Sequence, residues 1–160
     1  FKQKTAYEIY QCDWSSDVCS SDLKYLRPEP EDMKDPEFRA ISTRLTLYTA
    51  AVAISQVANH DKSGIFSTGL IPDGDIAMNV NGDIGVTLRV RNHHMVTIKD
   101  RCDKPRAAMT FGSLEIAGQL LRGEVSAMGC ICDGSIAMSG MVNMIDNVNR
   151  ILDRVSIYLA

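Results

Sequence analysis

The sequence has no uninterrupted apolar run of the length that crosses a lipid bilayer. A transmembrane helix needs about 20 consecutive apolar residues. The longest apolar stretch, residues 45–58, is shorter than that and contains the polar residues Thr46, Thr49, Ser55 and Gln56. The sequence therefore predicts no integral membrane segment.

An excess of charge of either sign is also missing. The 160 residues contain 17 Lys and Arg and 20 Asp and Glu, which gives a formal net charge of −3 at pH 7. Domains that bind nucleic acid concentrate Lys and Arg into a strong positive potential. Because the charges here are scattered along the chain, we predict no nucleic-acid partner.

Short catalytic motifs are absent as well. The sequence contains no G-x-S-x-G nucleophile elbow, no phosphate-binding glycine loop and no H-E-x-x-H zinc motif. Asp73, Asp75 and Asp83 lie beside Gly74 and Gly82, which is typical of turns rather than of paired catalytic carboxylates. We therefore predict neither enzymatic activity nor a bound cofactor.

Cysteine and histidine do not recur at metal-ligand spacing. Cys130 and Cys132 form a C-x-C pair, but a zinc site needs four ligands and only Cys102 and distant histidines remain. In a strand, the two cysteines would lie about 6.5–7 Å apart, at the limit for a disulfide. His93 and His94 would point to opposite faces of an extended chain. We predict reduced thiols, solvent-facing histidines in a turn, and no metal.

Residues 1–23 differ in character from the rest of the chain. The stretch DWSSDVCSSDL, residues 13–23, holds four Ser and three Asp and has no period of 2 or 3.6. Its reverse translation resembles a short-read sequencing adapter, and residues 2–9, KQKTAYEI, resemble the flow-cell end of the same primer. We therefore interpret residues 1–23 as an assembly artefact and exclude them from the fold. The alternative is a natural disordered tail.

Residues 24–160 are then the part of the chain from which we predict the fold. These 137 residues hold 15 Lys and Arg and 16 Asp and Glu, a formal net charge of −1. Their three cysteines, an odd number, indicate free thiols and a reducing compartment, with the cytoplasm as the default location. Residues 24–35, rich in proline and acidic residues, are expected to form a linker into a single domain, residues 36–160.

Apolar residues at helical spacing predict three helices. The first runs from Pro36 to about Val57, with Asp35 as its N-cap. The second covers residues 114–121, between an N-cap at Ser113 and a stop at Gly123. The third is the clearest, because its apolar residues fall on one stripe: Met141, Met144, Ile145, Val148, Leu152, Val155 and Leu159.

A period of two predicts short strands between these helices. The alternating segments are residues 76–80, 86–90, 95–98, 107–111 and 134–140. Turn sequences separate the first four segments at residues 72–74, 81–82, 91–93 and 103–105. Closely spaced strands with tight connections favour an antiparallel meander. The expected fold class is therefore α+β, with one mainly antiparallel sheet and helices packed on it.

Residues 111–152, FGSLEIAGQLLRGEVSAMGCICDGSIAMSGMVNMIDNVNRIL, resemble the C-terminal half of the sterol carrier protein type 2 domain family. In that family a short helix closes with a glycine, and a G-x-(I/L)-x-(I/L/M)-x-G strand precedes the last helix. The matching positions here are Gly123, Gly134, Ile136, Met138 and Gly140. The resemblance extends over residues 60–160, and the long first helix is similar to that of bacterial stand-alone relatives.

The resemblance implies a five-stranded sheet whose helices enclose an apolar tunnel for acyl chains, sterols or similar lipids. Flexible methionine side chains suit such a wall, although they also fill ordinary cores. The residues expected to line the tunnel are Met78, Leu88, Met109, Phe111, Leu121, Ile136, Met138, Met141, Ile145, Val148 and Leu152. The predicted function is therefore a non-enzymatic lipid-binding or carrier domain for a small hydrophobic ligand.

Two alternatives stay open at this point. One is a thiol- or metal-dependent enzyme or redox sensor that uses Cys102, Cys130 and Cys132. The other is an accessory domain of a longer protein, with a collapsed tunnel, which the acidic residues 24–35 suggest.

Deleting residues 1–23 should change the free energy of unfolding by no more than about 0.5 kcal/mol, because an artefact has no complementary surface on the fold. Urea unfolding of both chain lengths measures this. In the full chain, fluorescence of Trp14, the single tryptophan, should report an indole in water. Cys12 and Cys19 should form no disulfide with the cysteines of residues 24–160. A buried Trp14, or a cost of several kcal/mol, would contradict the interpretation.

Overall fold

The computed structural model of the chain describes residues 24–159. The expectations for Cys12, Trp14 and Cys19 lie outside the described residues. The chain divides into two compact units, residues 1–42 and residues 43–160, and each is described by itself.

In the first unit, the described residues 24–42 contain a short 3-10 helix, η1 (Asp32–Lys34), and the beginning of helix α3 (Pro36–His60). The Tyr25 ring stacks on Phe38 with their centroids 4.7 Å apart. The hydroxyl of Ser42 donates to the Tyr25 carbonyl at 2.6 Å. These two contacts join residues 24–26 to the first two turns of α3. The acidic segment thus has local contacts of its own.

Helix α3 starts where the sequence predicts and ends three residues later than predicted. The Asp35 carboxylate accepts the Glu37 N–H at 3.0 Å, which confirms the predicted N-cap. Beyond its last residue, His60, the chain enters a further helix, α4 (Lys62–Gly69), after one connecting residue, Asp61. This helix is not among the three that the sequence predicts, and Asp61 is its N-cap, because its side chain accepts the N–H groups of Ser63 and Gly64.

The second unit contains a five-stranded sheet with the strand order β3-β2-β1-β4-β5. The strands are β1 (Gly74–Val80), β2 (Gly85–Arg91), β3 (His94–Ile98), β4 (Ala107–Phe111) and β5 (Ile136–Gly140). Strands β1, β2 and β3 form the predicted antiparallel meander. The hairpin between β2 and β3 turns on Asn92 and His93, both with positive φ, as a two-residue hairpin requires.

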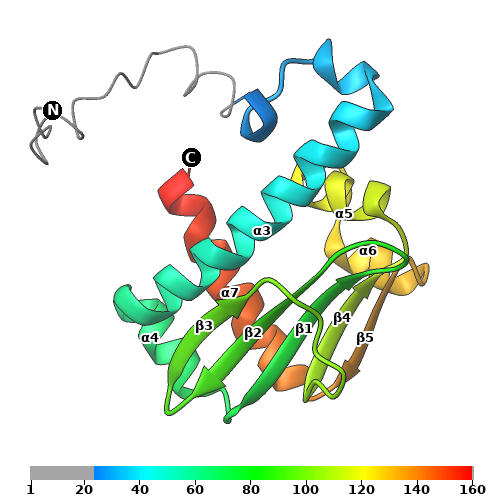
Figure 1. Cartoon of the computed structure of the whole chain (residues 1–160). Coiled ribbons are helices and arrows are strands. Elements are labelled where there is room, and N and C mark those ends of the chain that lie inside the picture. The colour runs from blue at the N-terminus through cyan, green and yellow to red at the C-terminus, as the bar shows by residue number, and fades with distance from the viewer. Residues whose placement is uncertain (1–23, 160) are drawn as a thin grey trace, which may run out of the picture. The chain divides into compact units, whose positions relative to one another are not determined.

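Strand β4 corrects the predicted topology, because it pairs with β1 in parallel and not with β3. The sheet is therefore mixed, although its other pairings are antiparallel. Residues 99–106, which include the turn predicted at residues 103–105, cross β2 and β1 on the face that the helices leave free (Figure 1). Thr87 donates to the Asp100 carbonyl at 2.7 Å, and Arg101 donates to the carbonyls of Val80 and Asp83. These bonds hold the crossing connection against the sheet.

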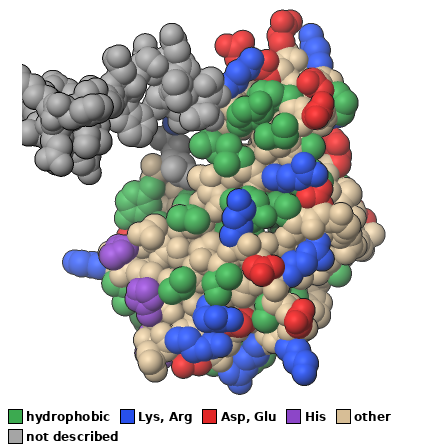
Figure 2. Space-filling view, viewed as in Figure 1, with side chains coloured by type: hydrophobic (Ala, Val, Ile, Leu, Met, Phe, Trp, Pro, Cys, Tyr) green, Lys and Arg blue, Asp and Glu red, His purple; other side chains and the backbone are tan. Residues whose placement is uncertain are grey.

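The helix-free face of the sheet is polar. Asp75, expected to be a turn residue, lies within β1 and forms ion pairs with Arg89 at 2.9 Å and Arg91 at 3.1 Å. The guanidinium of Arg89 lowers the pKa of Asp75 by hydrogen bonding to it. Lys and Arg side chains are interspersed with Asp and Glu on the face that Figure 2 shows. Opposite charges thus neutralise one another there locally.

The other face of the sheet is apolar and forms the core with the helices. Its fully buried side chains include Ile76, Val80, Leu88, Val90 and Met95. The helices that cover it after the sheet's fourth strand are α5 (Leu114–Leu121), α6 (Ala127–Cys132) and α7 (Val142–Leu159).

Helix α5 has the predicted bounds. The hydroxyl of Ser113 accepts the Ile116 N–H at 3.3 Å, and Gly123 has φ +72°, the left-handed conformation that ends a helix. Helix α6 was not predicted. Its N-cap, Ser126, accepts the Gly129 N–H at 3.0 Å. The C-x-C pair therefore lies in a helix and not in a strand.

Helix α3, from Thr43 onward, is tied to the sheet by polar side chains. Asn59 makes two hydrogen bonds with the backbone of Met95, at 2.8 and 2.9 Å. Thr97 donates to the Ala51 carbonyl at 2.8 Å, and Arg44 pairs with Asp83 at 2.7 Å. These contacts hold α3 across the meander half of the sheet.

Substituting Gly64 by Ala should destabilise the protein by about 2 kcal/mol or more, near the upper range of overpacking costs. A Cβ at Gly64 would overlap the Val57 carbonyl, where α4 folds back on α3. Gly69, in the same helix, has open space around its Cα. Gly69→Ala is therefore the matched control and should leave stability unchanged or raise it by up to about 1 kcal/mol. Urea unfolding distinguishes the two, and equal effects would contradict the close approach.

Candidate ligand-binding cavity

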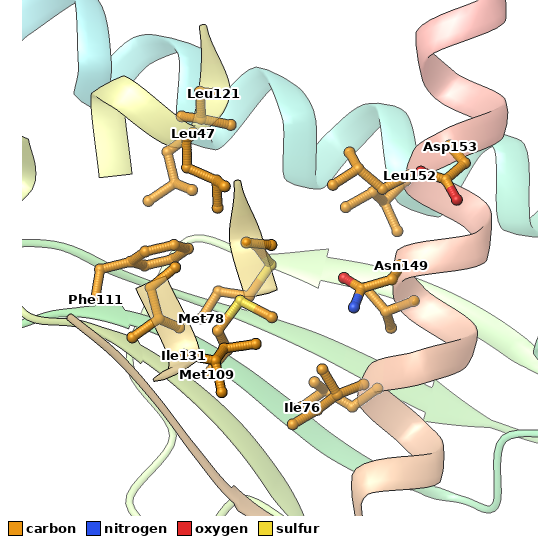
Figure 3. A pocket seen from close by; sticks show the side chains of 16 residues that line it. Leu47, Ile76, Met78, Met109, Phe111, Leu121, Ile131, Asn149, Leu152 and Asp153 are labelled. Atoms are coloured by element: carbon orange, nitrogen blue, oxygen red, sulfur yellow. The ribbon is translucent and has the colours of Figure 1, made fainter. Parts of the chain in front are cut away.

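A cavity of about 320 Å³ lies between the apolar face of the sheet and the helices. Its lining residues come from α3, β1, β4, α5, α6, β5 and α7 and are shown as sticks in Figure 3. They are Leu47, Ile54, Ile76, Met78, Met109, Phe111, Leu120, Leu121, Ala127, Ile131, Ile136, Ile145, Val148, Asn149, Leu152 and Asp153. Only two of these side chains are polar.

The parallel pair of strands forms the floor of the cavity. Met78 of β1 is in register with Met109 of β4. Because residues in register share a face of the sheet, both thioethers point to the same side. Phe111 of β4 is in register with Ile136 of the edge strand β5. The floor thus combines two flexible methionines with a large, almost fully buried aromatic ring.

Helix α7 forms one wall. Its apolar residues recur at helical spacing, so that Ile145, Val148 and Leu152 face the cavity. Asn149 and Asp153 follow at the edge of the same stripe and are exposed to solvent. In Figure 3, Asn149 extends from α7 into the space between that helix and the methionines of the floor. The cavity therefore reaches solvent along this edge of α7.

Eight of the residues predicted to line a tunnel do line this cavity: Met78, Met109, Phe111, Leu121, Ile136, Ile145, Val148 and Leu152. That they contact a ligand stays a prediction. Leu88 is fully buried in the core, but it lies on β2, one strand beyond the floor. Met138 is half-buried on β5, and Met141 precedes α7 with 38% of its surface exposed. These three do not line the cavity.

The sequence analysis missed eight lining residues, of which Ile76 and Leu120 lie on a strand and a helix that were predicted. Leu47 and Ile54 lie on a helix that was predicted, but its apolar residues occur on every side and mark no single face. Ala127 and Ile131 lie on α6, for which the N-cap Ser126 was an unused signal. Asn149 and Asp153 directly flank the predicted apolar stripe of α7, so helical spacing could have shown them as its polar border.

A carboxylate holds the C-terminal part of α7 in place. Asp61 accepts the Tyr158 hydroxyl at 2.7 Å and pairs with Arg154 at 3.3 Å. It also accepts the N–H groups of Ser63 and Gly64 at the start of α4. The hydrogen bonds from Tyr158, Gly64 and Arg154 hold the pKa of Asp61 well below its usual range. One charged group thus joins the α3–α4 corner to the wall of the cavity.

The three cysteines of the described residues are free thiols that do not form a common site. Cys102 lies in the connection on the polar face of the sheet, where its Sγ donates to Asp75 at 3.6 Å. Cys130 is buried in α6, and Cys132 is exposed at the end of that helix. Within residues 24–159, no three His, Cys, Asp or Glu side chains gather as metal ligands would.

The same range of residues contains no helix that is both long enough and apolar enough to span a membrane. His93 and His94 are exposed, as predicted, although His94 begins β3 and only His93 lies in the turn. His60, at the end of α3, is exposed as well.

No protein-family model matches the sequence, and no curated protein matches it significantly. Solved structures do match the fold. Domain 2 of the sterol carrier protein of Helicoverpa armigera superposes with a TM-score of 0.53 at 13% identity, over 69% of this chain and 87% of that one. Sterol carrier protein 2 from Yarrowia lipolytica, in its apo form, has a TM-score of 0.51 at 16% identity, over 68% and 88%. The fold is therefore like that of sterol carrier protein 2 domains, as the sequence resemblance implied.

Asp61→Asn should make the free energy of unfolding less sensitive to acid. The folded pKa of Asp61 lies below its unfolded value, so its stabilisation is fully present above about pH 5 and is lost as the pH falls. Asn keeps the N-cap but cannot carry the charge that Arg154 and Tyr158 bind. Urea unfolding between pH 6 and 2.5 measures the two slopes.

The matched control for this experiment is Asp146→Asn, which removes a carboxylate from the exposed pair with Arg150 on the outer side of α7. This variant should keep most of the acid sensitivity of the unaltered protein. Equal slopes for Asp61→Asn and the unaltered protein would show that the Asp61 contacts contribute no stability.

Proposed function

We propose that this domain binds a single-chain hydrophobic ligand in the cavity and carries it without transforming it. The observation that supports this most is an apolar cavity that the core leaves unfilled, between the methionine floor and α7. Cores normally pack to the density of organic crystals, so a void of this size costs stability unless it has a use. The likeness of the fold to sterol carrier protein 2 domains supports the same reading.

The cavity volume limits the size of the ligand. An engineered apolar cavity of ~150 Å³ accepts benzene, which has six carbon atoms. By that ratio, 320 Å³ accommodates about a dozen carbon atoms. A medium-length hydrocarbon chain fits this volume, whereas a longer one has to project past α7 into solvent.

Binding would be driven by transfer of hydrocarbon out of water, at about 0.8 kcal/mol for each buried CH₂ group. The methionines of the floor can change rotamers at little cost, so they adapt to ligands of different shape. We therefore expect loose selectivity for the form of the chain.

Catalysis has less support from the same geometry. The only polar lining side chains, Asn149 and Asp153, lie at the exposed edge of the cavity. The thiol alternative needs Cys102 and Cys130 to act together, but the sheet lies between them. Neither arrangement places a nucleophile beside a base, as covalent catalysis requires.

Val148→Phe should weaken binding of a twelve-carbon ligand at least tenfold, because the larger ring fills part of the cavity and displaces the equivalent of two or more CH₂ groups. Displacement of a neutral fluorophore, N-phenyl-1-naphthylamine, by dodecan-1-ol measures the affinity. Native mass spectrometry of the gently purified protein tests for a ligand that is already bound.

Val142→Phe is the matched control. It makes the same change on the same helix, at a side chain with 60% of its surface exposed and outside the cavity. Its affinity for dodecan-1-ol should match that of the unaltered protein. A folded Val148→Phe variant that binds as tightly as the control, or an unaltered protein that binds no alkyl ligand, would overturn the proposal.

A further inference from the structure

We propose that the edge of α7 selects the head group of the ligand. Resting on the proposed function, this inference names the class of ligand: a single-chain amphiphile whose head donates hydrogen bonds and carries no negative charge. A primary ammonium or a hydroxyl group has this chemistry. A carboxylate, the head of a fatty acid, does not.

The polar groups of the cavity are confined to one place. Of the 16 lining side chains, only Asn149 and Asp153 are polar. They are four residues apart on α7, and side chains at that spacing lie one above the other on the same face of a helix. Both are at the exposed edge (Figure 3), where the head of an amphiphile lies once its chain is buried.

None of the lining residues within the described part of the chain is a Lys or an Arg, and the arginines nearest to them in sequence are engaged elsewhere. Arg122, which follows the lining residues of α5, pairs with Glu124 at 2.6 Å. Arg150 pairs with Asp146 at 3.1 Å. Arg154, next to Asp153 in the chain, pairs with Asp61 at 3.3 Å. Each of these guanidinium groups already has a carboxylate partner.

The Asp153 carboxylate, by contrast, has no hydrogen-bond or ion-pair partner among residues 24–159, and neither does the Asn149 side chain. An ionised carboxylate only accepts hydrogen bonds. Asp153 therefore offers its full charge and acceptor capacity to whatever occupies the edge of the cavity, and the carbonyl of Asn149 adds one more acceptor. A donor head completes this pair, whereas an anionic head meets a like charge.

The expected order of affinity is dodecylammonium, then dodecan-1-ol, then dodecanoate. At an exposed position, a single charge pair about 4 Å apart in water changes affinity by roughly five- to tenfold. The ammonium and the carboxylate should therefore differ by more than that factor, because the interaction with Asp153 changes sign between them. The alcohol provides the uncharged reference with the same chain.

Displacement of N-phenyl-1-naphthylamine by the three ligands at pH 7.5, below their micelle concentrations, measures this order. Asp153→Asn should reduce the ratio of ammonium to carboxylate affinity by more than roughly five- to tenfold, because it removes both the attraction to the ammonium and the repulsion of the carboxylate. The affinity for dodecan-1-ol should stay within about twofold. Asp146→Asn, the same charge change on the outer side of α7, should leave the ratio as in the unaltered protein. Asp153→Lys should invert the order of the two charged ligands.

Three results would overturn the inference. Equal binding of the three ligands by the unaltered protein would show that the head is not recognised. Tighter binding of dodecanoate than of dodecan-1-ol would show that an anion is preferred. An equal effect of Asp146→Asn and Asp153→Asn would show that the selectivity arises from the net charge of the protein and not from Asp153. In each of these cases dodecan-1-ol still binds, so the proposed function stands. If none of the three ligands binds, both the proposed function and this inference are wrong.

Discussion

The parallel pairing of β1 with β4 is the constraint on which the rest of the structure depends. It brings Met78 beside Met109 and places the edge strand β5 next to β4, so that one half of the sheet becomes the floor of the cavity. It also forces residues 99–106 to cross the sheet, because β3 lies at one edge and β4 lies on the far side of β2 and β1. The crossing connection then covers part of the polar face and leaves the apolar face to the helices (Figure 1).

The helices seal one part of the apolar face as core and leave a cavity over the other part. From Thr43 onward, α3 lies over the meander and is fastened there by Asn59 and Thr97, so Leu88 and Met95 are sealed beneath it as ordinary core. Over β1, β4 and β5, the helices leave an unfilled space, with α7 as its wall. Asp61 binds the far end of that wall from outside the cavity, through Arg154 and Tyr158.

The chemistry of the cavity follows from this division. Apolar side chains from seven elements line the cavity, and under the proposed function this surface would bind hydrocarbon through its area and not through its shape. In the proposal, direction comes only from the α7 edge, where Asn149 and Asp153 are exposed and the adjacent Arg150 and Arg154 are paired with other carboxylates. A carrier built in this way would bind the hydrocarbon chain of its ligand with little selectivity and would distinguish ligands by their head groups.

The sequence by itself determined most of the local elements, but not the short helices α4 and α6. The bounds of α5, the stripe of α7, the N-cap at Asp35 and the alternating strands all depend on hydrogen bonds and periodicities that span a few residues. The order of the strands in the sheet does not depend on such local signals, because a period of two is the same in a parallel and in an antiparallel pair. Only the tertiary structure decided that β4 lies beside β1, that Leu88 is core rather than lining, and that Asn149 and Asp153 are the polar edge. A cavity is a place where several elements meet without filling the space, and packing across the whole sheet decides where that happens.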